Sequence, residues 1–235
     1  MTLPLVFPAG ATRYPGRHVV VDALLKDGAA GVPVVVKKVR VTFRQRRLTR
    51  GERSLATARA LLERGIRTPE PVGVELRDGE SWYVCRKLEG AVQIRAWFLK
   101  RDEPSRPVPA VDASFEEVID AAARLARRMH DAGVFFRDFT DGNLLVTREG
   151  GTLAIWLVDL DRARIGAGAL GRFRRMRDLS RLGLNRPADR KMLLERYFAP
   201  EKPPAGWAAA VGALRHRIVL WDSLKRGLRP WRRPR

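Results

Sequence analysis

Three side chains near the middle of the chain have the types and the spacing that phosphoryl transfer from ATP requires. Asp138 is followed five residues later by Asn143, and Asp159 directly follows the apolar segment 155–158. Such a reaction needs a carboxylate within hydrogen-bond reach of the attacking hydroxyl, and oxygen ligands that hold Mg²⁺ against the β- and γ-phosphates. Asp138 suits the first task, and Asn143 with Asp159 suits the second. The pattern therefore predicts a phosphotransferase that uses ATP and Mg²⁺.

Two features of the sequence bear on this interpretation. Asp141, Gly142 and Asn143 are also turn formers, so the segment 138–143 can be explained as a simple turn; the position of Asp159 after an apolar strand favours catalysis. The reaction further needs a cation on the α- and β-phosphates. Lys37 follows the run Val34, Val35 and Val36 on a predicted strand, and Lys38 is its rival for this role.

The elements that must position these residues change in kind along the chain. Alternating and β-branched runs predict strands in the first third, with one helix among them, and a capping box at Ser114 and Glu117 opens a long apolar-faced helix after it. The predicted strands are 18–25, 32–41, 72–76, 82–88, 143–147 and 153–158, and the first helix is 54–64. This order predicts a two-lobed α+β fold, with a β-rich N-lobe at 1–88 and a helical C-lobe at 89–235 that together form one domain.

The composition limits the partners more than the reaction. The chain has 235 residues, 46 Lys and Arg against 26 Asp and Glu, a net charge of +20 and a single cysteine, Cys85. One cysteine excludes a disulfide framework and a cysteine zinc site, which fits a reducing cytoplasm. Arginine supplies 38 of the 46 basic residues, and its guanidinium binds phosphate oxygens in pairs, so we expect anionic partners. Nucleic-acid binding rests on charge alone, and no base-reading motif supports it.

Taken together, these motifs resemble the protein-kinase-like fold and, more closely, the lipopolysaccharide core sugar kinases, the Kdo and heptose kinase family. The resemblance extends over about 19–183. The segments that carry it are 35–37, 62–71, 129–134, 138–143 and 158–163. It implies an ATP-dependent kinase that phosphorylates a Kdo or heptose hydroxyl of the lipopolysaccharide inner core, at the cytoplasmic face of the inner membrane.

The resemblance also implies a role for each matching residue. Asp138 would be the catalytic base, Asn143 and Asp159 would bind Mg²⁺, and Asp161 would be a further metal ligand. Lys37 would hold the ATP phosphates, and it is favoured over Lys38 because the family's lysine directly follows the valine run. The backbone of 85–88 would receive the adenine. The implied partners are a lipid A–core glycolipid and an anionic membrane surface, with no specific nucleic acid, and we expect a monomer.

The sequence departs from the kinase pattern in three places. Phe136 stands where a histidine is usual, no glutamate is evident as the partner of the strand lysine, and no Gly-x-Gly-x-x-Gly motif occurs near the first strands. Glu52 and Glu63 are offset from the expected glutamate position, where Ser54 stands. These departures leave two alternatives open: another small-molecule or protein kinase of the same fold, such as an antibiotic phosphotransferase, or a degenerate kinase that acts as a binding protein.

Two basic segments admit both a structural and a functional interpretation. A cluster of arginines follows the predicted metal-binding Asp159, and it either binds phosphates of the acceptor or forms a solvated helix face. Its members are Arg172, Arg174, Arg175 and Arg177. In the tail, apolar residues recur at helical spacing among arginines. We expect 214–224 to pack as a last helix and 227–235 to bind a membrane surface. His130 is expected to be structural rather than a base, and Cys85 to be a small buried apolar residue.

Overall fold

The computed structural model describes residues 2–14, 18–27, 30–41 and 48–228. These residues form two compact units, which are described separately. The sheet unit comprises Met1–Ala91 with Trp156–Ile165, and the helical unit comprises Val92–Ile155 with Gly166–Arg235. The fold is a mixture of α-helices and β-strands.

The sheet unit is built on an antiparallel sheet in the strand order β1-β3-β4-β6-β5, with β2 paired to β3. Its strands are β1 (Leu5–Val6), β2 (Arg13–Tyr14), β3 (Val19–Asp27), β4 (Ala30–Arg40), β5 (Pro71–Arg77) and β6 (Glu80–Arg86). Alternate residues of the central strands face one core, where Val34, Val36 and Val84 are fully buried. Because side chains alternate along a strand, the neighbours Lys37 and Lys38 of β4 must lie on opposite faces.

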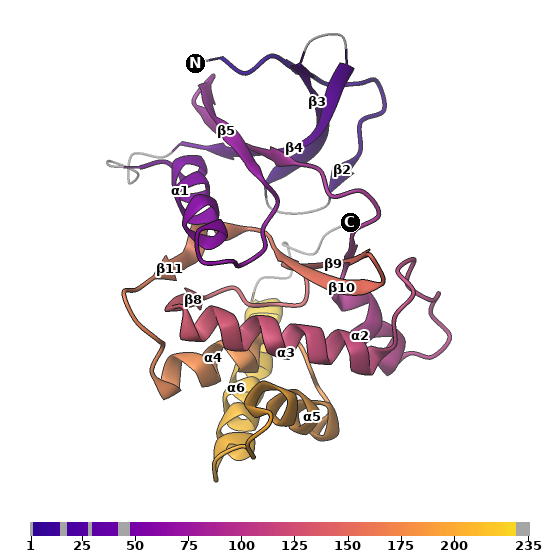
Figure 1. Cartoon of the computed structure of the whole chain (residues 1–235), viewed down its shortest axis with the longest axis vertical. Coiled ribbons are helices and arrows are strands. Elements are labelled where there is room, and N and C mark those ends of the chain that lie inside the picture. The colour runs from indigo at the N-terminus through magenta and orange to yellow at the C-terminus, as the bar shows by residue number, and fades with distance from the viewer. Residues whose placement is uncertain (1, 15–17, 28–29, 42–47, 229–235) are drawn as a thin grey trace. The chain divides into compact units, whose positions relative to one another are not determined.

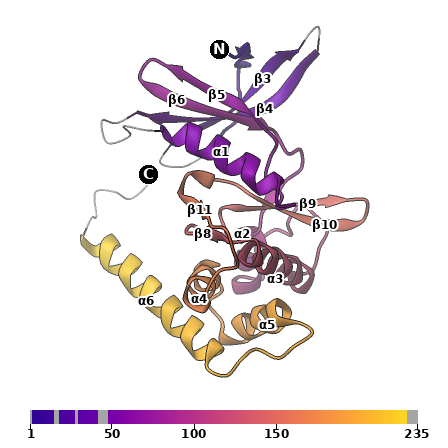
Figure 2. The same ribbon diagram turned by 60° about the vertical axis from the view of Figure 1, so that its left-hand side comes forward.

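One helix, α1 (Arg50–Leu62), lies along a face of this sheet against β4, β5 and β6 (Figures 1 and 2). It begins four residues before the predicted start at Ser54. The reason is a capping box that sequence inspection missed: the Thr49 hydroxyl accepts from the Glu52 backbone, and the Glu52 carboxylate accepts from the Thr49 backbone. Gly51 lies so close to Ser81 that an added Cβ would stand 2.3 Å from its hydroxyl oxygen. The small residue therefore allows the helix to approach the sheet.

The helical unit is organised around α3 (Phe115–Asp131), the helix predicted from the Ser114–Glu117 capping box. Its apolar face is fully buried along Val118, Ala122 and Met129. The other helices of the unit are α2 (Arg95–Asp102), α4 (Arg172–Arg181), α5 (Pro187–Phe198) and α6 (Trp207–Leu228). In Figure 1, α5 lies beside α3, and α6 contacts both α4 and α5.

Short strands and turns complete the described chain. A three-stranded sheet has the order β10-β9-β7. The strands are β7 (Val92–Gln93), β8 (Val134–Phe136), β9 (Leu144–Glu149), β10 (Thr152–Leu157) and β11 (Ala163–Ile165), and Leu160–Arg162 is a 3-10 turn, η1. The predicted strand segments at 18–25, 32–41, 72–76, 82–88, 143–147 and 153–158 all correspond to observed strands. Sequence inspection did not find β1, β2, β7, β8, β11 or α2.

The last helix agrees only in part with its predicted packing. Leu214 and Ile218 are half-buried, but Trp221 and Leu224 are each more than half exposed. The helix α6 has 22 residues, about 33 Å at 1.5 Å per residue, whereas its neighbours α4 and α5 have 10 and 12. The packed part is its first half, where Trp207 and Val211 are buried. Of the predicted surface-binding tail 227–235, residues 229–235 lie outside the described residues.

Candidate active site

In the sheet unit, one lysine and two aspartates of the predicted site lie together. The Lys37 ammonium donates a hydrogen bond to Asp159 Oδ1, and its Nζ lies 4.0 Å from Asp161 Oδ1. Lys37 comes from β4, whereas both aspartates come from the segment after β10, more than 120 positions further along the chain. The fold therefore assembles a cation and two carboxylates that the sequence separates.

Lys38 lies elsewhere. Its ammonium stands over two rings that contact each other edge to face, 3.7 Å from the centroid of Trp82 and 4.4 Å from that of Phe7. Burial lowers the pKa of Lys38 below its ordinary value, although the charge of Glu80 acts in the opposite direction. This cation–π arrangement fits a structural lysine. The alternation of β4 thus leaves Lys37 as the lysine that contacts the two aspartates.

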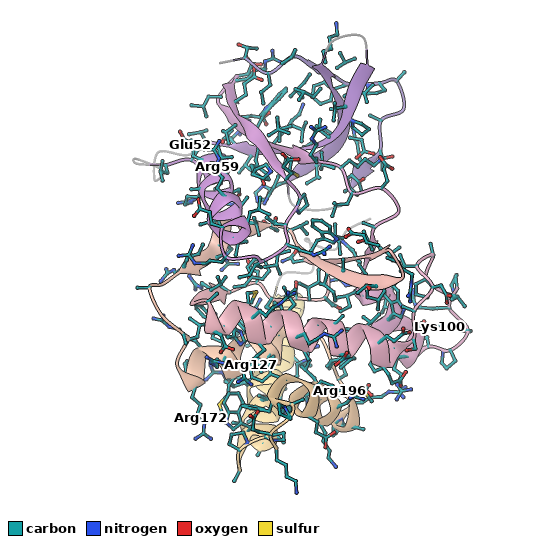
Figure 3. The ribbon with its side chains drawn as sticks, viewed as in Figure 1. Glu52, Arg59, Lys100, Arg127, Arg172 and Arg196 are labelled. Carbon is teal, nitrogen blue, oxygen red and sulfur yellow. The ribbon has the colours of Figure 1, made fainter. Side chains whose placement is uncertain are left out.

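The helix α1 brings no carboxylate to Lys37. Glu52 is held in the capping box at the start of the helix, where Figure 3 labels it, and Glu63 is the C-cap. Instead, α1 supplies an arginine: Arg50 Nε lies 3.7 Å from Asp161 Oδ2, and Arg50 Nη1 lies 3.0 Å from His18 Nε2. Lys37 therefore lies beside both aspartates, and Arg50 lies beside Asp161.

The two aspartates differ in their protonation behaviour. Burial alone would raise the pKa of Asp159, but the charge and hydrogen bond of Lys37 lower it below its ordinary value. For Asp161, burial raises the pKa, and the neighbouring Asp159 charge adds to the shift. Asp159 also adopts a left-handed backbone conformation, with φ 63° and ψ 56°. A non-glycine residue held there costs conformational energy, and such strain gathers at functional positions.

In the helical unit, a tight loop holds Asp138 and Asn143. The Asn143 side-chain amide donates to the Asp138 carbonyl at 2.9 Å, and the Thr140 backbone N–H donates to the same carbonyl at 2.7 Å. Since the amide nitrogen of Asn143 is used inside the loop, its Oδ1 is the atom left to accept a cation. The loop is fastened from outside by Arg95, which pairs with Asp141 at 3.0 Å and crowds Gly142. The turn chemistry and the catalytic interpretation are therefore compatible.

Phe136, which replaces the usual histidine, is a core residue. Its side chain is fully buried and packs edge to face on Phe139. Its backbone N–H donates to Asp178 Oδ2 of α4 at 2.9 Å. Asp178 is itself fully buried, and burial raises its pKa to about 8. The segment before Asp138 is thus held through its backbone, which a phenylalanine does not disturb.

His130 has a structural place, as expected from the sequence. It lies buried in the last turn of α3, where its Nδ1 is 2.9 Å from the Tyr197 hydroxyl. Burial, helped by the charge of Arg175, lowers its pKa to about 3. Its Nε2 lies 3.6 Å from Asp178 Oδ2. A neutral histidine and a protonated aspartate, side by side in the core, avoid the cost of a buried charge.

In the segment expected to bind adenine, 85–88, some of the hydrogen-bonding groups already have partners within the sheet unit. Arg86 N donates to the Glu70 carbonyl, and Lys87 N donates to the Pro33 carbonyl. The Lys87 ammonium also pairs with Asp22 at 2.9 Å. Cys85 is half-buried, and burial raises the pKa of its thiol to about 12. Any nucleotide base bound here has to use the backbone groups of 85–88 that these contacts leave over.

The structure thus places the predicted site residues in two sets. Lys37, Asp159 and Asp161 meet in the sheet unit, while Asp138 and Asn143 meet in the helical unit. Sequence inspection missed the residues around them. These are Arg50, Arg95, Asp178 and Arg181, the last of which lies with its Nη2 3.4 Å from Asp138 Oδ1. An aspartate between the apolar residues Met176 and Leu179 is the signal that could have indicated Asp178.

The residues present are suited to a magnesium ion. Among the described residues, no three His, Cys, Asp or Glu side chains gather as a metal site. Mg²⁺ does not need such a cage, because it is usually held by one or two carboxylates together with substrate phosphates and water. Asp159 and Asp161 would provide these carboxylates, and both already face a cation, the ammonium of Lys37.

Comparison with known proteins identifies the class. The model of the lipopolysaccharide kinase (Kdo/WaaP) family matches residues 34–197, more than half of the chain, so the chain belongs to this family of kinases. Among solved structures, it is similar to WaaP in complex with acyl carrier protein, with a TM-score of 0.54 and 21% identity. That match covers 92% of this chain and 86% of the other, and it shows a common fold. No curated protein matches the sequence.

Proposed function

We propose that the chain transfers the γ-phosphate of ATP to a sugar hydroxyl, on Kdo or heptose, in the inner core of lipopolysaccharide. The observation that carries this proposal is the meeting of Lys37 with Asp159 and Asp161, in a chain that belongs to a lipopolysaccharide kinase family. Phosphoryl transfer depends mostly on positioning and charge stabilisation, and these are what such a cluster supplies.

In this proposal, the sheet unit holds the phosphates. Lys37 exchanges part of its pairing with Asp159 for the α- and β-phosphates, and Arg50 provides a second positive charge beside Asp161. Mg²⁺, held by Asp159, Asp161 and Asn143, would neutralise charge on the β- and γ-phosphates. The left-handed backbone of Asp159 sets the direction of its Cα–Cβ bond, and the hydrogen bond from Lys37 holds its carboxylate before any ligand arrives.

Asp138 acts on the acceptor. Its carboxylate would accept the proton of the sugar hydroxyl as the oxygen of that hydroxyl attacks the γ-phosphorus, while the bond from this phosphorus to the bridging oxygen breaks and ADP leaves. The loop contacts of Asn143 and Thr140 act on the Asp138 carbonyl, so they fix its backbone without using the carboxylate, which pairs with Arg181. The reaction requires both sets of residues to act on one ATP molecule. We therefore retain the two-lobed arrangement, with lobes 1–88 and 89–235, as part of the proposal.

The cellular location of the chain is proposed from the nature of the acceptor and from the exposed surface of α6. No helix within the described ranges is long and apolar enough to cross a bilayer. The second half of α6 nevertheless exposes Leu220, Trp221 and Leu224, next to Arg217. An exposed apolar stripe beside arginines can rest on an anionic membrane. We propose peripheral binding to the cytoplasmic face of the inner membrane, with acyl carrier protein, which is bound in the similar WaaP structure, as a further partner to test.

An acceptor panel tests the proposal. The purified chain, with Mg²⁺ and ATP labelled on the γ-phosphate, is offered a lipid A–core glycolipid, an aminoglycoside and a generic protein substrate. We expect label on the glycolipid alone. Label on the aminoglycoside or the protein instead would assign the chain to another kinase activity of the same fold.

A degenerate kinase that only binds its ligands is the second candidate. The observation that favours it is the lack of an α1 carboxylate near Lys37 among the described residues. Both an active kinase and a degenerate kinase can bind ATP, so phosphate transfer to an acceptor is the measurement that distinguishes them. ATP binding without label on any acceptor would support the binding protein.

A further inference from the structure

The arginines of α4 do not form one uniform basic face. The guanidinium of Arg175 is fully engaged in contacts within the protein. It donates to the Leu170 carbonyl at 2.7 Å and to the Tyr197 hydroxyl at 2.9 Å, and it pairs with Asp131 at 2.8 Å. Arg172 is exposed and stands 5.8 Å from the ring of Trp207; Figure 3 labels it near the start of α4. The contacts of these two arginines are with residues outside the loop that carries Asp138.

Arg177 and Arg181 are different. They lie four positions apart, so they share one side of the helix, and both are half-buried. Arg181 Nη2 is 3.4 Å from Asp138 Oδ1. The Arg177 guanidinium stands 5.1 Å from the centroid of the Phe135 ring, beside the segment that carries Arg137 and Asp138. In keeping with this placement, burial and then the charges of Arg181 and Arg137 lower the pKa of Arg177. Three positive charges therefore gather around the predicted catalytic base.

The negative charge in this neighbourhood does not balance them. Asp138 is one carboxylate, and Asp141 of the same loop already pairs with Arg95. Burial raises the pKa of Asp178 to about 8, so this third carboxyl group is mostly neutral at pH 7. Arg181 also has a buried Nε with no hydrogen-bond partner in the described part of the chain. Like charges gathered in a partly buried place repel one another, and a bound anion would relieve this repulsion.

We propose that Arg137, Arg177 and Arg181 form an anion subsite beside Asp138, which binds a carboxylate or phosphate on the acceptor sugar itself. The inference rests on the proposed function, because it takes Asp138 as the group that meets the acceptor hydroxyl. Guanidinium groups bind both kinds of anion through paired hydrogen bonds. An anion that engages Arg181 also releases Asp138 Oδ1 from its ion pair, so the base becomes available when the acceptor is in place.

The two sources of the anion can be told apart with simple probes. Kdo is a sugar acid that carries its own carboxylate, whereas a heptose is neutral unless it is phosphorylated. Binding to the full-length chain is measured by calorimetry with free Kdo, with the methyl ester of Kdo and with inorganic phosphate. Weaker binding of the ester than of Kdo would assign the subsite to a sugar carboxylate. Binding of phosphate, with Kdo and its ester equal, would assign it to a phosphorylated acceptor.

Substitutions test the residues. Arg177→Gln and Arg181→Gln should each weaken anion binding about tenfold or more, the effect of one charge-assisted hydrogen bond. Arg172→Gln, on the same helix, should leave it unchanged. Asp138→Asn should keep or tighten binding, since it removes the competing negative charge. Thermal unfolding is followed for each variant, and Arg181→Lys, which keeps the charge, serves where Arg181→Gln does not fold.

The result separates this inference from the proposed function. Equal anion binding in Arg172→Gln, Arg177→Gln and Arg181→Gln, or no binding of any probe, would overturn the subsite even if the chain transfers phosphate. Arginine-dependent anion binding without phosphate transfer would leave the subsite standing and refute the kinase assignment. In an active enzyme, Arg177→Gln should raise the KM for the acceptor and leave the KM for ATP unchanged.

Discussion

Replacing Asp178 by asparagine should remove a pH dependence from the free energy of unfolding. In the folded protein the pKa of Asp178 is raised from 3.8 to about 8, chiefly by burial. The unfolded chain releases this proton near pH 4, while the folded protein holds it to about pH 8. The contribution of the group to stability is therefore complete below pH 4 and is lost progressively as the pH rises toward 8.

The cleanest window lies between pH 6.5 and pH 8. His130 acts in the opposite direction, because its pKa is lowered from 6.5 to about 3, so its contribution changes only below about pH 6.5. One bound proton is worth about 1.4 kcal/mol per pH unit, so the wild-type protein should lose at most about 2 kcal/mol across the window. For a protein of this size that corresponds to a fall in Tm of roughly 4–8 °C.

The assay compares three proteins by thermal and denaturant unfolding at several pH values in that window. The Asp178→Asn variant keeps an oxygen that accepts the Phe136 N–H and has no proton to exchange, so its stability should decline less than that of the wild type. Asp120→Asn, in an exposed helical ion pair with Arg124, is the control and should follow the wild type. Parallel curves for wild type and Asp178→Asn would refute a buried, protonated aspartate at this position.

Three further predictions concern stability. Gly133→Ala should destabilise the protein by about 2 kcal/mol or more, because Gly133 has φ +75° and a Cβ there would stand 2.5 Å from the Gly168 carbonyl oxygen; Gly168→Ala, which meets nothing within 4 Å, should cost far less, as thermal unfolding of both would show. Thr49→Ala should cost about 1 kcal/mol by removing one half of the capping box with Glu52, and denaturant titration measures it; an unchanged midpoint would contradict this role of the hydroxyl. His130→Gln should weaken the loss of stability on acidification from pH 6.5 toward pH 3, since the unfolded chain takes up a proton that the buried ring refuses; an acid titration as steep as that of the wild type would contradict it.

Much of the fold could be predicted because local rules agree with the tertiary structure. The hairpin strands β3 and β4 follow from β-branched runs, and the Asp78–Gly79 turn between β5 and β6 has the positive φ angles expected of that pair. The start of α1 was predicted four residues late because its apolar pattern begins at Leu55. The cap that starts the helix uses polar residues, Thr49 and Glu52, which hydrophobic periodicity does not detect.

The candidate site could be predicted only as separate motifs. Spacing indicated Asp138, Asn143 and Asp159, but not that Arg50 would stand beside Asp161 in place of a glutamate beside Lys37. Those contacts join positions far apart in the chain, so no local pattern encodes them. The choice between Lys37 and Lys38 illustrates the limit: the family resemblance favoured Lys37, but the contacts that distinguish the two lysines, with Asp159 for Lys37 and with Trp82 for Lys38, come from the fold.

Measurements of ATP binding test directly whether Lys37, and not Lys38, holds the phosphates. Lys37→Ala should weaken Mg²⁺-dependent ATP binding about tenfold or more, because it removes one charge-assisted contact to the phosphates. Lys38→Ala, on the opposite face of the same strand, is the matched control and should bind ATP like the wild type. Equal losses in both variants, measured by calorimetry, would contradict the assignment of Lys37.

The central claim, that Asp138 directs phosphate from ATP to a lipopolysaccharide core sugar, is tested most directly by a single-turnover transfer assay. The full-length chain is mixed with Mg²⁺, labelled ATP and a lipid A–core glycolipid, and label on the glycolipid is followed for wild type, Asp138→Asn and Asp120→Asn. We expect transfer by wild type and Asp120→Asn at similar rates, and a loss of about a hundredfold or more in Asp138→Asn. Equal transfer by Asp138→Asn, or none by the wild type, would contradict it.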